Sequence, residues 1–196
     1  PLVLVNVSRG IAAPVSLGPD HNDVLAARDC GFLQIHAASC QEVLDSVLIA
    51  TRLAEDERVR LPVIVNLDGF HLSFTREPVE IPELAAVREF LPPFDAGTTR
   101  FRASRPISQA VAVLGGGPYS YFRYELHRAA QAALGVHAEL SREFEARFGR
   151  ANPALAISPT RASRDWIIHS AMRSALRGPM PGMRFSSVMS AAMAAG

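Results

Sequence analysis

The sequence predicts an α/β fold with a parallel sheet, and the order of its apolar segments leads to this prediction. Three short apolar runs, at residues 3–7, 32–36 and 62–67, have the length and the β-branched content of buried strands. Each run passes directly into a loop rich in polar residues. A helical pattern at 40–57 separates the second run from the third, and a strand, a helix and a strand in this order form a right-handed parallel unit.

The helix at 40–57 has a recognisable start and an apolar face. Ser39 and Glu42 have the spacing of a capping box, in which two side chains bond to the free N–H groups at the start of a helix. Apolar residues then recur at helical spacing as far as Ala54, and the charged run 55–58 follows them. We therefore expect the helix to begin at Cys40.

The second half of the chain is predicted to be an arm and a long helix. Residues 78–118 are rich in proline and glycine, which favours an ordered arm that wraps a surface, with a short helix near 83–90. Residues 120–148 form the longest helical pattern, with Gly149 where a C-cap glycine is expected. The apolar face of this helix consists of Phe122, Leu126, Ala129, Ala133, Val136, Leu140 and Phe144.

A binding site is expected in the loops after the three strands, because parallel sheets bind ligands at the carboxyl ends of their strands. Arg9 stands directly after the first strand. Its guanidinium group presents a planar fork of donors that matches a carboxylate at two points. Two readings stay open from the residues alone: Arg9 binds a small acid, or it pairs with a neighbouring aspartate for structure.

Two polar clusters share these loops. Asp20-His21-Asn22-Asp23 contains metal-ligating residue types, but Asp and Asn also dominate turns and helix N-caps. The preferred interpretation is a turn in which Asp20 or Asn22 caps a short helix over Asp23–Cys30, and no metal is assigned. Asp68-Gly69-Phe70 is read with equal weight as a tight turn or as part of a site, because glycine permits close backbone approach.

Composition excludes several classes of function. The formal charge is +1, so nothing indicates nucleic acid or an anionic membrane as a partner. No apolar run reaches the ~20 residues that a membrane helix needs. Cys30 and Cys40 are too few for an iron–sulfur cluster, which usually takes four thiolates. Two thiols without a secretion signal predict a reduced, cytoplasmic protein.

Several motifs occur in the same order as in one known family. They are Arg9 to Pro14, Asp20 to Asp23, Ala27 to Phe32, Gln41-Glu42, Asp68 to Phe70 with Ser73 and Glu77 to Glu80, Phe90 to Phe94, Tyr121 to Tyr124, and Glu143-Phe144 with Phe148 to Arg150. Over about residues 2–150 the chain resembles the alpha subunit of the 2-oxoacid:ferredoxin oxidoreductases, of which pyruvate:ferredoxin oxidoreductase is the best-known member. One departure is Phe74, where the family often has histidine.

The resemblance implies an enzyme that oxidatively decarboxylates a 2-oxoacid, such as pyruvate, to an acyl-CoA and passes electrons to ferredoxin. Its cofactor would be thiamine diphosphate with Mg²⁺, shared with a beta subunit, and iron–sulfur clusters would lie only on partner subunits. Arg9 matches the family's arginine that binds the carboxylate of the 2-oxoacid. The loops with Asp20, His21 and Asp23, and with Asp68 and Gly69, would lie near the active site or the subunit contacts. No catalytic acid or base is named, because the family's activating glutamate belongs to an earlier part of the domain.

The expected organisation has four parts. Residues 1–77 would be the carboxyl-terminal half of a thiamine diphosphate pyrimidine-binding domain, 78–118 the arm, 119–150 the long helix, and 151–196 a truncated or aberrant start of a second domain. Three strands leave an open sheet edge, so the isolated chain is expected to be marginally stable and inactive. Two alternatives stay open: a scaffold module or decayed gene fragment that keeps the fold, and an unrelated nucleotide-binding domain. The latter lacks its glycine-rich fingerprint after the first strand.

Overall fold

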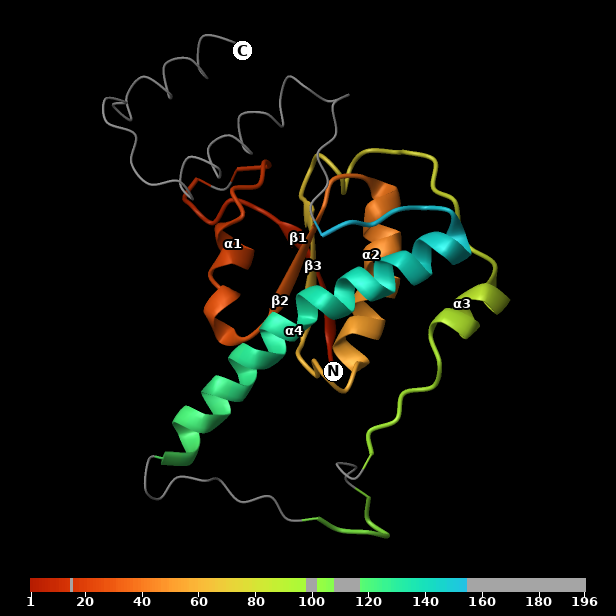
Figure 1. Ribbon diagram of the computed structural model, residues 1–196. Coiled ribbons are helices and arrows are strands. Elements are labelled where there is room, and N and C mark those ends of the chain that lie inside the picture. The colour runs from red at the N-terminus through yellow and green to blue at the C-terminus, as the bar shows by residue number, and fades with distance from the viewer. Residues whose placement is uncertain (15, 98–101, 108–116, 155–196) are drawn as a thin grey trace, which may run out of the picture. The chain divides into compact units, whose positions relative to one another are not determined.

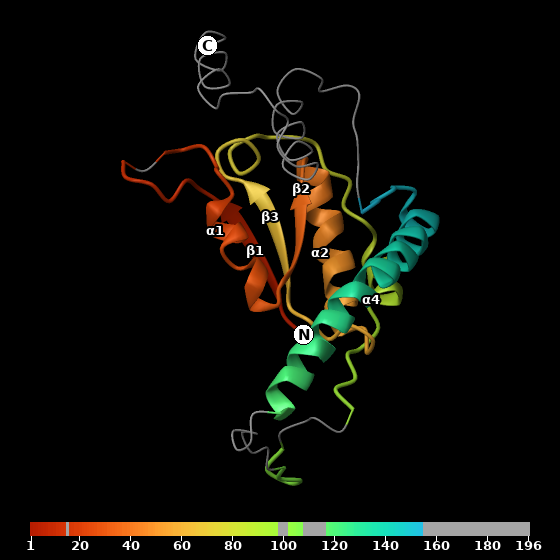
Figure 2. The same ribbon diagram turned by 60° about the vertical axis from the view of Figure 1, so that its left-hand side comes forward.

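Three parallel strands lie at the centre of the fold, between helix α1 on one face and helix α2 on the other (Figures 1 and 2). The computed structural model describes residues 1–14, 16–97, 102–107 and 117–154, which all lie in the unit Pro1–Ala154. The elements are β1 (Val3–Ser8), α1 (Asn22–Leu25), a 3-10 helix (Arg28–Cys30), β2 (Leu33–Ala37), α2 (Cys40–Glu55), β3 (Val63–Asp68), α3 (Leu84–Phe90) and α4 (Gly117–Phe148). None of the described helices is long and apolar enough to cross a membrane.

The sheet has the strand order β1-β3-β2, and both pairs are parallel as the sequence predicted. Asn66 of the central strand β3 lies opposite Asn6 of β1 and His36 of β2. Because side chains alternate between the two faces of a strand, these three polar residues share one face. The same alternation places Val63 and Val65 on the opposite face.

The hydrophobic core fills the space between that second face of the sheet and helices α2 and α4. Val63 and Val65 are fully buried there. Phe90 of α3 and Phe144 of α4 are also fully buried, and their rings meet edge to face with 5.4 Å between centroids. The arm and the long helix therefore contribute core residues to this unit rather than merely covering its surface.

Helix α2 begins at Cys40, as the capping-box pattern predicted. The Ser39 hydroxyl accepts a hydrogen bond from the Glu42 N–H at 3.2 Å. In return the Glu42 carboxylate accepts from the Ala38 N–H at 2.7 Å, one residue before the N-cap. Both bonds satisfy backbone donors that have no partner inside the helix.

Helix α4 matches the predicted long helix, with one correction to its apolar face. Ala133 and Leu140 are buried as expected, but Phe122 is 49% exposed. The first turns of α4 extend past the sheet, so position 122 has no core beneath it (Figures 1 and 2). At the other end Gly149 has φ 70° and donates its N–H to the Glu145 carbonyl, which confirms the predicted C-cap.

The predicted helix over Asp23–Cys30 is wrong. Helix α1 ends at Leu25, and a separate 3-10 helix follows over Arg28–Cys30. Gly31, in a left-handed conformation with φ 92°, ends this 3-10 helix. The N-cap is His21, in a left-handed conformation and without a side-chain cap bond. Asp20 instead accepts from the Asn22 N–H at 3.0 Å, which closes a local turn.

The start of the arm is tied to the beginning of α2. The Gln41 amide exchanges two hydrogen bonds with the backbone of Glu80, at 2.6 and 3.2 Å. Glu77 accepts from the Cys40 N–H at 3.1 Å. Residues 155–196 of the expected second-domain segment 151–196 lie outside the described residues, and the four-part division of the chain stays a prediction.

Candidate functional site at the carboxyl ends of the strands

The carboxyl ends of β1 and β3 bring two distant loops together. Ser8 ends β1 and lies opposite Asp68, which ends β3. Arg9 and Gly69 are the residues that follow these two strand ends, so the loops that the sequence singled out begin side by side. The N–H of Gly69 donates to the Ser8 carbonyl at 2.9 Å, which extends the contact one step beyond the ladder.

Gly69 is required at its position because the Ser8 carbonyl and the Arg9 side chain both lie against it. A Cβ atom added to Gly69 would stand 2.2 Å from the Ser8 carbonyl oxygen and 2.6 Å from Nε of Arg9. Any larger residue would push apart the two strand ends or displace the arginine.

The Arg9 side chain is partly buried, and its guanidinium donates to the Leu17 carbonyl. No carboxylate of the described residues pairs with it. Asp20 bonds to Asn22, and Asp68 faces His21 at 3.4 Å. In the described part of the chain, Arg9 therefore has no acidic partner with which it could form a structural ion pair.

Asp23 joins helix α1 to the end of β1. Its carboxylate accepts four hydrogen bonds, from Asn6 Nδ2, Ser8 Oγ, the Arg9 N–H and the Val24 N–H. Burial alone raises the pKa of Asp23, but these four donors together outweigh it and hold the pKa of this carboxyl below its ordinary value of 3.8. The aspartate is therefore ionised at neutral pH.

Asn66 organises a second group of polar side chains on the same face of the sheet. It is buried, and its Oδ1 accepts from Asn6 Nδ2 at 2.7 Å. Its Nδ2 lies 3.3 Å from Nδ1 of His21 and 3.2 Å from Nδ1 of His36. Since an amide nitrogen only donates, both Nδ1 atoms accept, and each neutral ring carries its proton on Nε2. The Nε2–H of His21 is then 3.4 Å from Asp68, the last residue of β3.

The surroundings of His36 disfavour its charged form. Although the residue as a whole is exposed, desolvation of the ring is the largest effect and lowers the pKa of His36 below its ordinary 6.5; the nearby His21 lowers it further, and Asp68 opposes both effects. Protonation of Nδ1 would also point a proton at the Asn66 amide. Desolvation of the ring and the contact of Nδ1 with Asn66 thus both favour the neutral form of His36.

The structure brings together most of the residues predicted for the site. Arg9, Asp23, Asp68 and Gly69 meet at the strand ends, and His21 reaches Asp68. Asp20 stays outside this group, in its own turn with Asn22.

Sequence reasoning missed three residues of the site: Asn6, Asn66 and His36. Each is a polar residue near the end of an otherwise apolar run. That shared position could have identified them, because the pleat then places all three on one face.

No metal site forms in this group. Among the described residues, no set of three or more His, Cys, Asp and Glu side chains is placed to hold a metal ion. The Nδ1 atoms of both histidines are already occupied by Asn66. Arg9 is the group at these strand ends that can bind a small anion.

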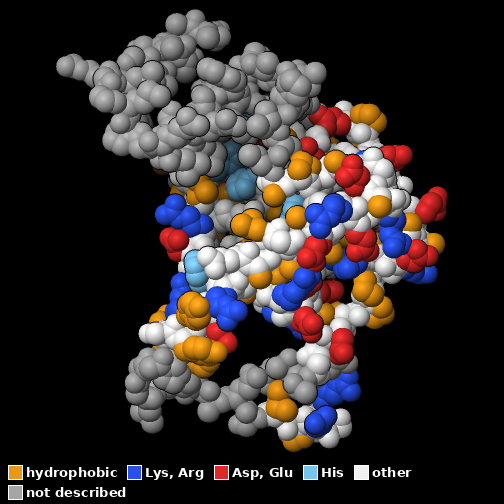
Figure 3. Space-filling model, in the orientation of Figure 1, with side chains coloured by type: hydrophobic (Ala, Val, Ile, Leu, Met, Phe, Trp, Pro, Cys, Tyr) orange, Lys and Arg blue, Asp and Glu red, His pale blue; other side chains and the backbone are white. Residues whose placement is uncertain are grey.

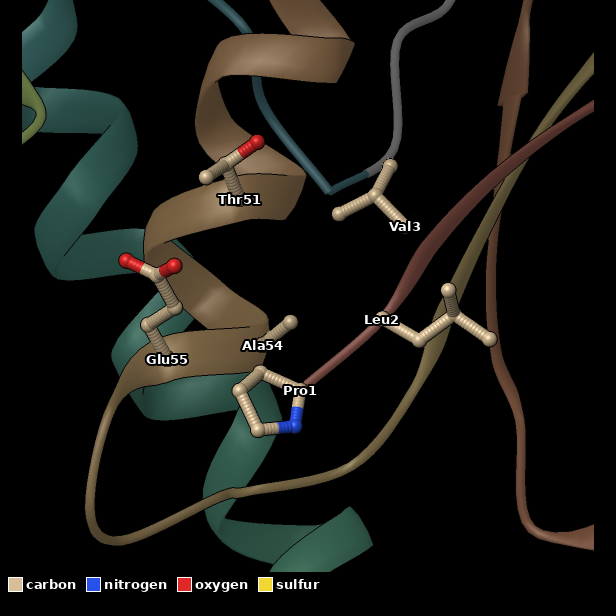
Figure 4. A pocket seen from close by; sticks show the side chains of 6 residues that line it. All are labelled: Pro1, Leu2, Val3, Thr51, Ala54 and Glu55. Carbon is tan, nitrogen blue, oxygen red and sulfur yellow. The ribbon is translucent and has the colours of Figure 1, made fainter. Parts of the chain in front are cut away.

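A shallow hollow of about 210 Å³ lies at the other end of the sheet. Pro1, Leu2 and Val3 form one side of it, and Thr51, Ala54 and Glu55 of α2 form the other (Figure 4). It begins where β1 begins, whereas Arg9 follows the end of β1. The hollow is therefore not part of the strand-end site.

Comparison with known proteins identifies the family of this chain. Residues 1–142 match the family model described as "Pyruvate flavodoxin/ferredoxin oxidoreductase, thiamine diP-bdg". The pyruvate synthase subunit PorA of Pyrococcus furiosus is 39% identical over 150 residues, which is 76% of this chain and 38% of that protein. PorA of Methanocaldococcus jannaschii is 39% identical over 152 residues, with the same shares.

A second kind of relative is the ketoisovalerate oxidoreductase subunit VorA of Pyrococcus horikoshii. It is 38% identical over 150 residues, which is 76% of this chain and 37% of that protein. The chain thus spans about two fifths of the length of these relatives. Because the family model matches residues 1–142 of 196, the chain belongs to the thiamine diphosphate-binding family of the pyruvate flavodoxin/ferredoxin oxidoreductases, as the order of its motifs predicted.

Proposed function

We propose that this chain is part of the alpha subunit of an enzyme that oxidatively decarboxylates a 2-oxoacid to an acyl-CoA and reduces ferredoxin. The observation that carries the proposal is the partly buried Arg9, which stands at a strand end without an acidic partner among the described residues. The relatives support it, since they are named for pyruvate and for ketoisovalerate, which are both 2-oxoacids.

Arg9 is proposed to bind the carboxylate of the 2-oxoacid. A guanidinium group has five N–H donors, and among the described residues only the bond from Nη1 to the Leu17 carbonyl engages them. The remaining donors can take a carboxylate at two points, which fixes the orientation of the substrate as well as its position. The contact with Gly69 holds the stem of the side chain while the guanidinium group does this.

Among the described residues, no group of three or more His, Cys, Asp and Glu side chains is placed to hold a metal ion. We assign thiamine diphosphate and Mg²⁺ to a site shared with a beta subunit, and iron–sulfur clusters to partner subunits. When bound, the cofactor supplies the carbanion-stabilising chemistry of the reaction. This chain supplies binding and orientation of the 2-oxoacid. The complete complex works in the cytoplasm with coenzyme A. The isolated chain, without its partner subunits, is inactive.

The test is Arg9→Ala and Arg9→Lys in the complete enzyme, assembled with its partner subunits. Loss of one partner of a buried charge pair costs about 2–5 kcal/mol, so kcat/KM for the 2-oxoacid should fall roughly 30-fold to several thousand-fold. Arg9→Lys should recover only part of the loss, because an ammonium group cannot make the two-point contact. Thiamine diphosphate affinity should remain near that of the parent.

Arg28→Ala is the matched control, because Arg28 is an exposed arginine whose ion pair is with its neighbour Asp29. It should leave kcat/KM unchanged. If Arg9→Ala and Arg9→Lys both kept kcat/KM within threefold of the parent, Arg9 would be structural, and a scaffold without this chemistry would become the better assignment.

A further inference from the structure

We propose that Asp23 is a positioning residue, which fixes the strand end that carries Arg9 in the orientation required to bind the 2-oxoacid. The inference rests on the proposed function, because it assigns to Asp23 a role that acts through Arg9. Asp23 itself need not touch the substrate.

The four bonds of Asp23 connect two elements. Oδ1 accepts from Ser8 Oγ at 2.9 Å and from the Val24 N–H at 2.8 Å. Oδ2 accepts from Asn6 Nδ2 and from the Arg9 N–H, each at 3.2 Å. Three of the four donors belong to the last part of β1 and the residue after it, so one carboxylate holds that strand end against the beginning of α1.

Arg9 depends on this carboxylate more than the residues before it do. The β1–β3 ladder ends at Ser8 and Asp68, so its pairing does not extend to Arg9. The backbone N–H of Arg9 bonds to Asp23, and its side chain rests on Gly69. These two contacts set where the guanidinium group starts and in which direction it leaves the sheet.

The role requires an ionised carboxylate. A carboxylate accepts at both oxygens, whereas the amide of asparagine replaces one acceptor by a donor. Asp23→Asn therefore turns an NH₂ group toward two of the present donors, whichever way the amide is oriented. A shift of about 1 Å in the position of a binding group can cost roughly 100-fold in rate, so loosening this contact should be visible in kcat/KM.

A double-mutant cycle tests the proposal in the complete enzyme. Asp23→Asn alone should lower kcat/KM for the 2-oxoacid about 10-fold to 100-fold. In an Arg9→Ala background the same change should cost less than threefold, because the group that Asp23 positions is already absent. Asp29→Asn removes the same charge at an exposed site and should have no effect in either background.

A second measurement does not depend on turnover. In this chain, the backbone amide resonance of Arg9 should move in Asp23→Asn and stay in place in Asp29→Asn. Should Asp23→Asn fail to fold, Ser8→Ala removes only one of the four donors and should lower kcat/KM several-fold, again only where Arg9 is present. Both variants should leave the thiamine diphosphate affinity unchanged.

The outcomes separate the two proposals. If Arg9→Ala itself kept kcat/KM within threefold, the proposed function would fail and the positioning role with it. If Arg9→Ala were strongly impaired while Asp23→Asn matched the parent, or cost as much with alanine at position 9 as with arginine, only the positioning role would be overturned. Asp23 would then serve the stability of the fold alone.

Discussion

Arg150 should be one of the most sensitive positions for the stability of this unit. Its guanidinium makes a two-point contact with Asp45 of α2, from Nε to Oδ2 and from Nη2 to Oδ1, both at 2.8 Å. The Asp45 side chain is only 3% exposed and that of Arg150 18%. The guanidinium also lies over the Phe144 ring, 5.7 Å from its centroid. The contact thus attaches the segment after α4 to the middle of α2.

Arg150→Ala would leave the Asp45 carboxylate buried without its cation. Breaking a buried ion pair in this way costs about 3–5 kcal/mol. We expect about 3 kcal/mol, because the partial exposure of Arg150 lets water reach the carboxylate after truncation and Gln41 still donates to it. For a unit of this size such a loss corresponds to a decrease in melting temperature of roughly 6–12 °C.

The assay is urea unfolding of the full chain, followed by circular dichroism, with the free energy of unfolding compared between variants. Arg58→Ala is the control, because Arg58 pairs with Asp56 and Glu139 at the surface. Charges of both signs are interspersed on this surface (Figure 3). The control substitution should therefore change the free energy of unfolding little. Adding Asp45→Asn to Arg150→Ala should recover part of the loss, since no unpaired charge is then buried. A loss below about 1 kcal/mol for Arg150→Ala would refute this account of the pair.

Two further predictions concern the candidate site. Gly69→Ala should destabilise the chain by about 1–3 kcal/mol, because the added Cβ would collide with the Ser8 carbonyl. Gly135→Ala in α4 is the control: it has open space around it and should stabilise the chain by about 0.5–1 kcal/mol. Equal effects of the two changes in urea unfolding would contradict the packing described. The lowered pKa of His36 means that the unfolded chain binds more protons between the folded pKa and about 6.5, so stability should fall as pH decreases through this interval. An NMR titration should place the pKa of His36 below 6.5. His36→Gln should flatten this part of the curve of stability against pH. If the ring titrated at 6.5 or higher, its surroundings would not disfavour the protonated imidazole.

Local patterns in the sequence determined the elements of this fold. Apolar runs of strand length predicted all three strands, and the spacing of Ser39 and Glu42 predicted the first residue of α2. Gly149 marked the end of α4 in the same way. These signals succeed because strand burial and helix capping depend on residues close together in the chain. The order of short motifs also identified the family, and the apolar run 3–7 placed Arg9 at a strand end.

Only the tertiary structure decided which polar residues meet. Asp23 was expected to start a helix, yet its carboxylate turns to β1, because three donors at that strand end face it. Asn66 contacts two histidines that lie 45 and 30 residues away in sequence. Phe122 fits the apolar face of its helix but has no core beneath it. The physical reason is common to these cases: a local pattern fixes the face on which a side chain lies, whereas strand register and the docking of helices fix what that face meets.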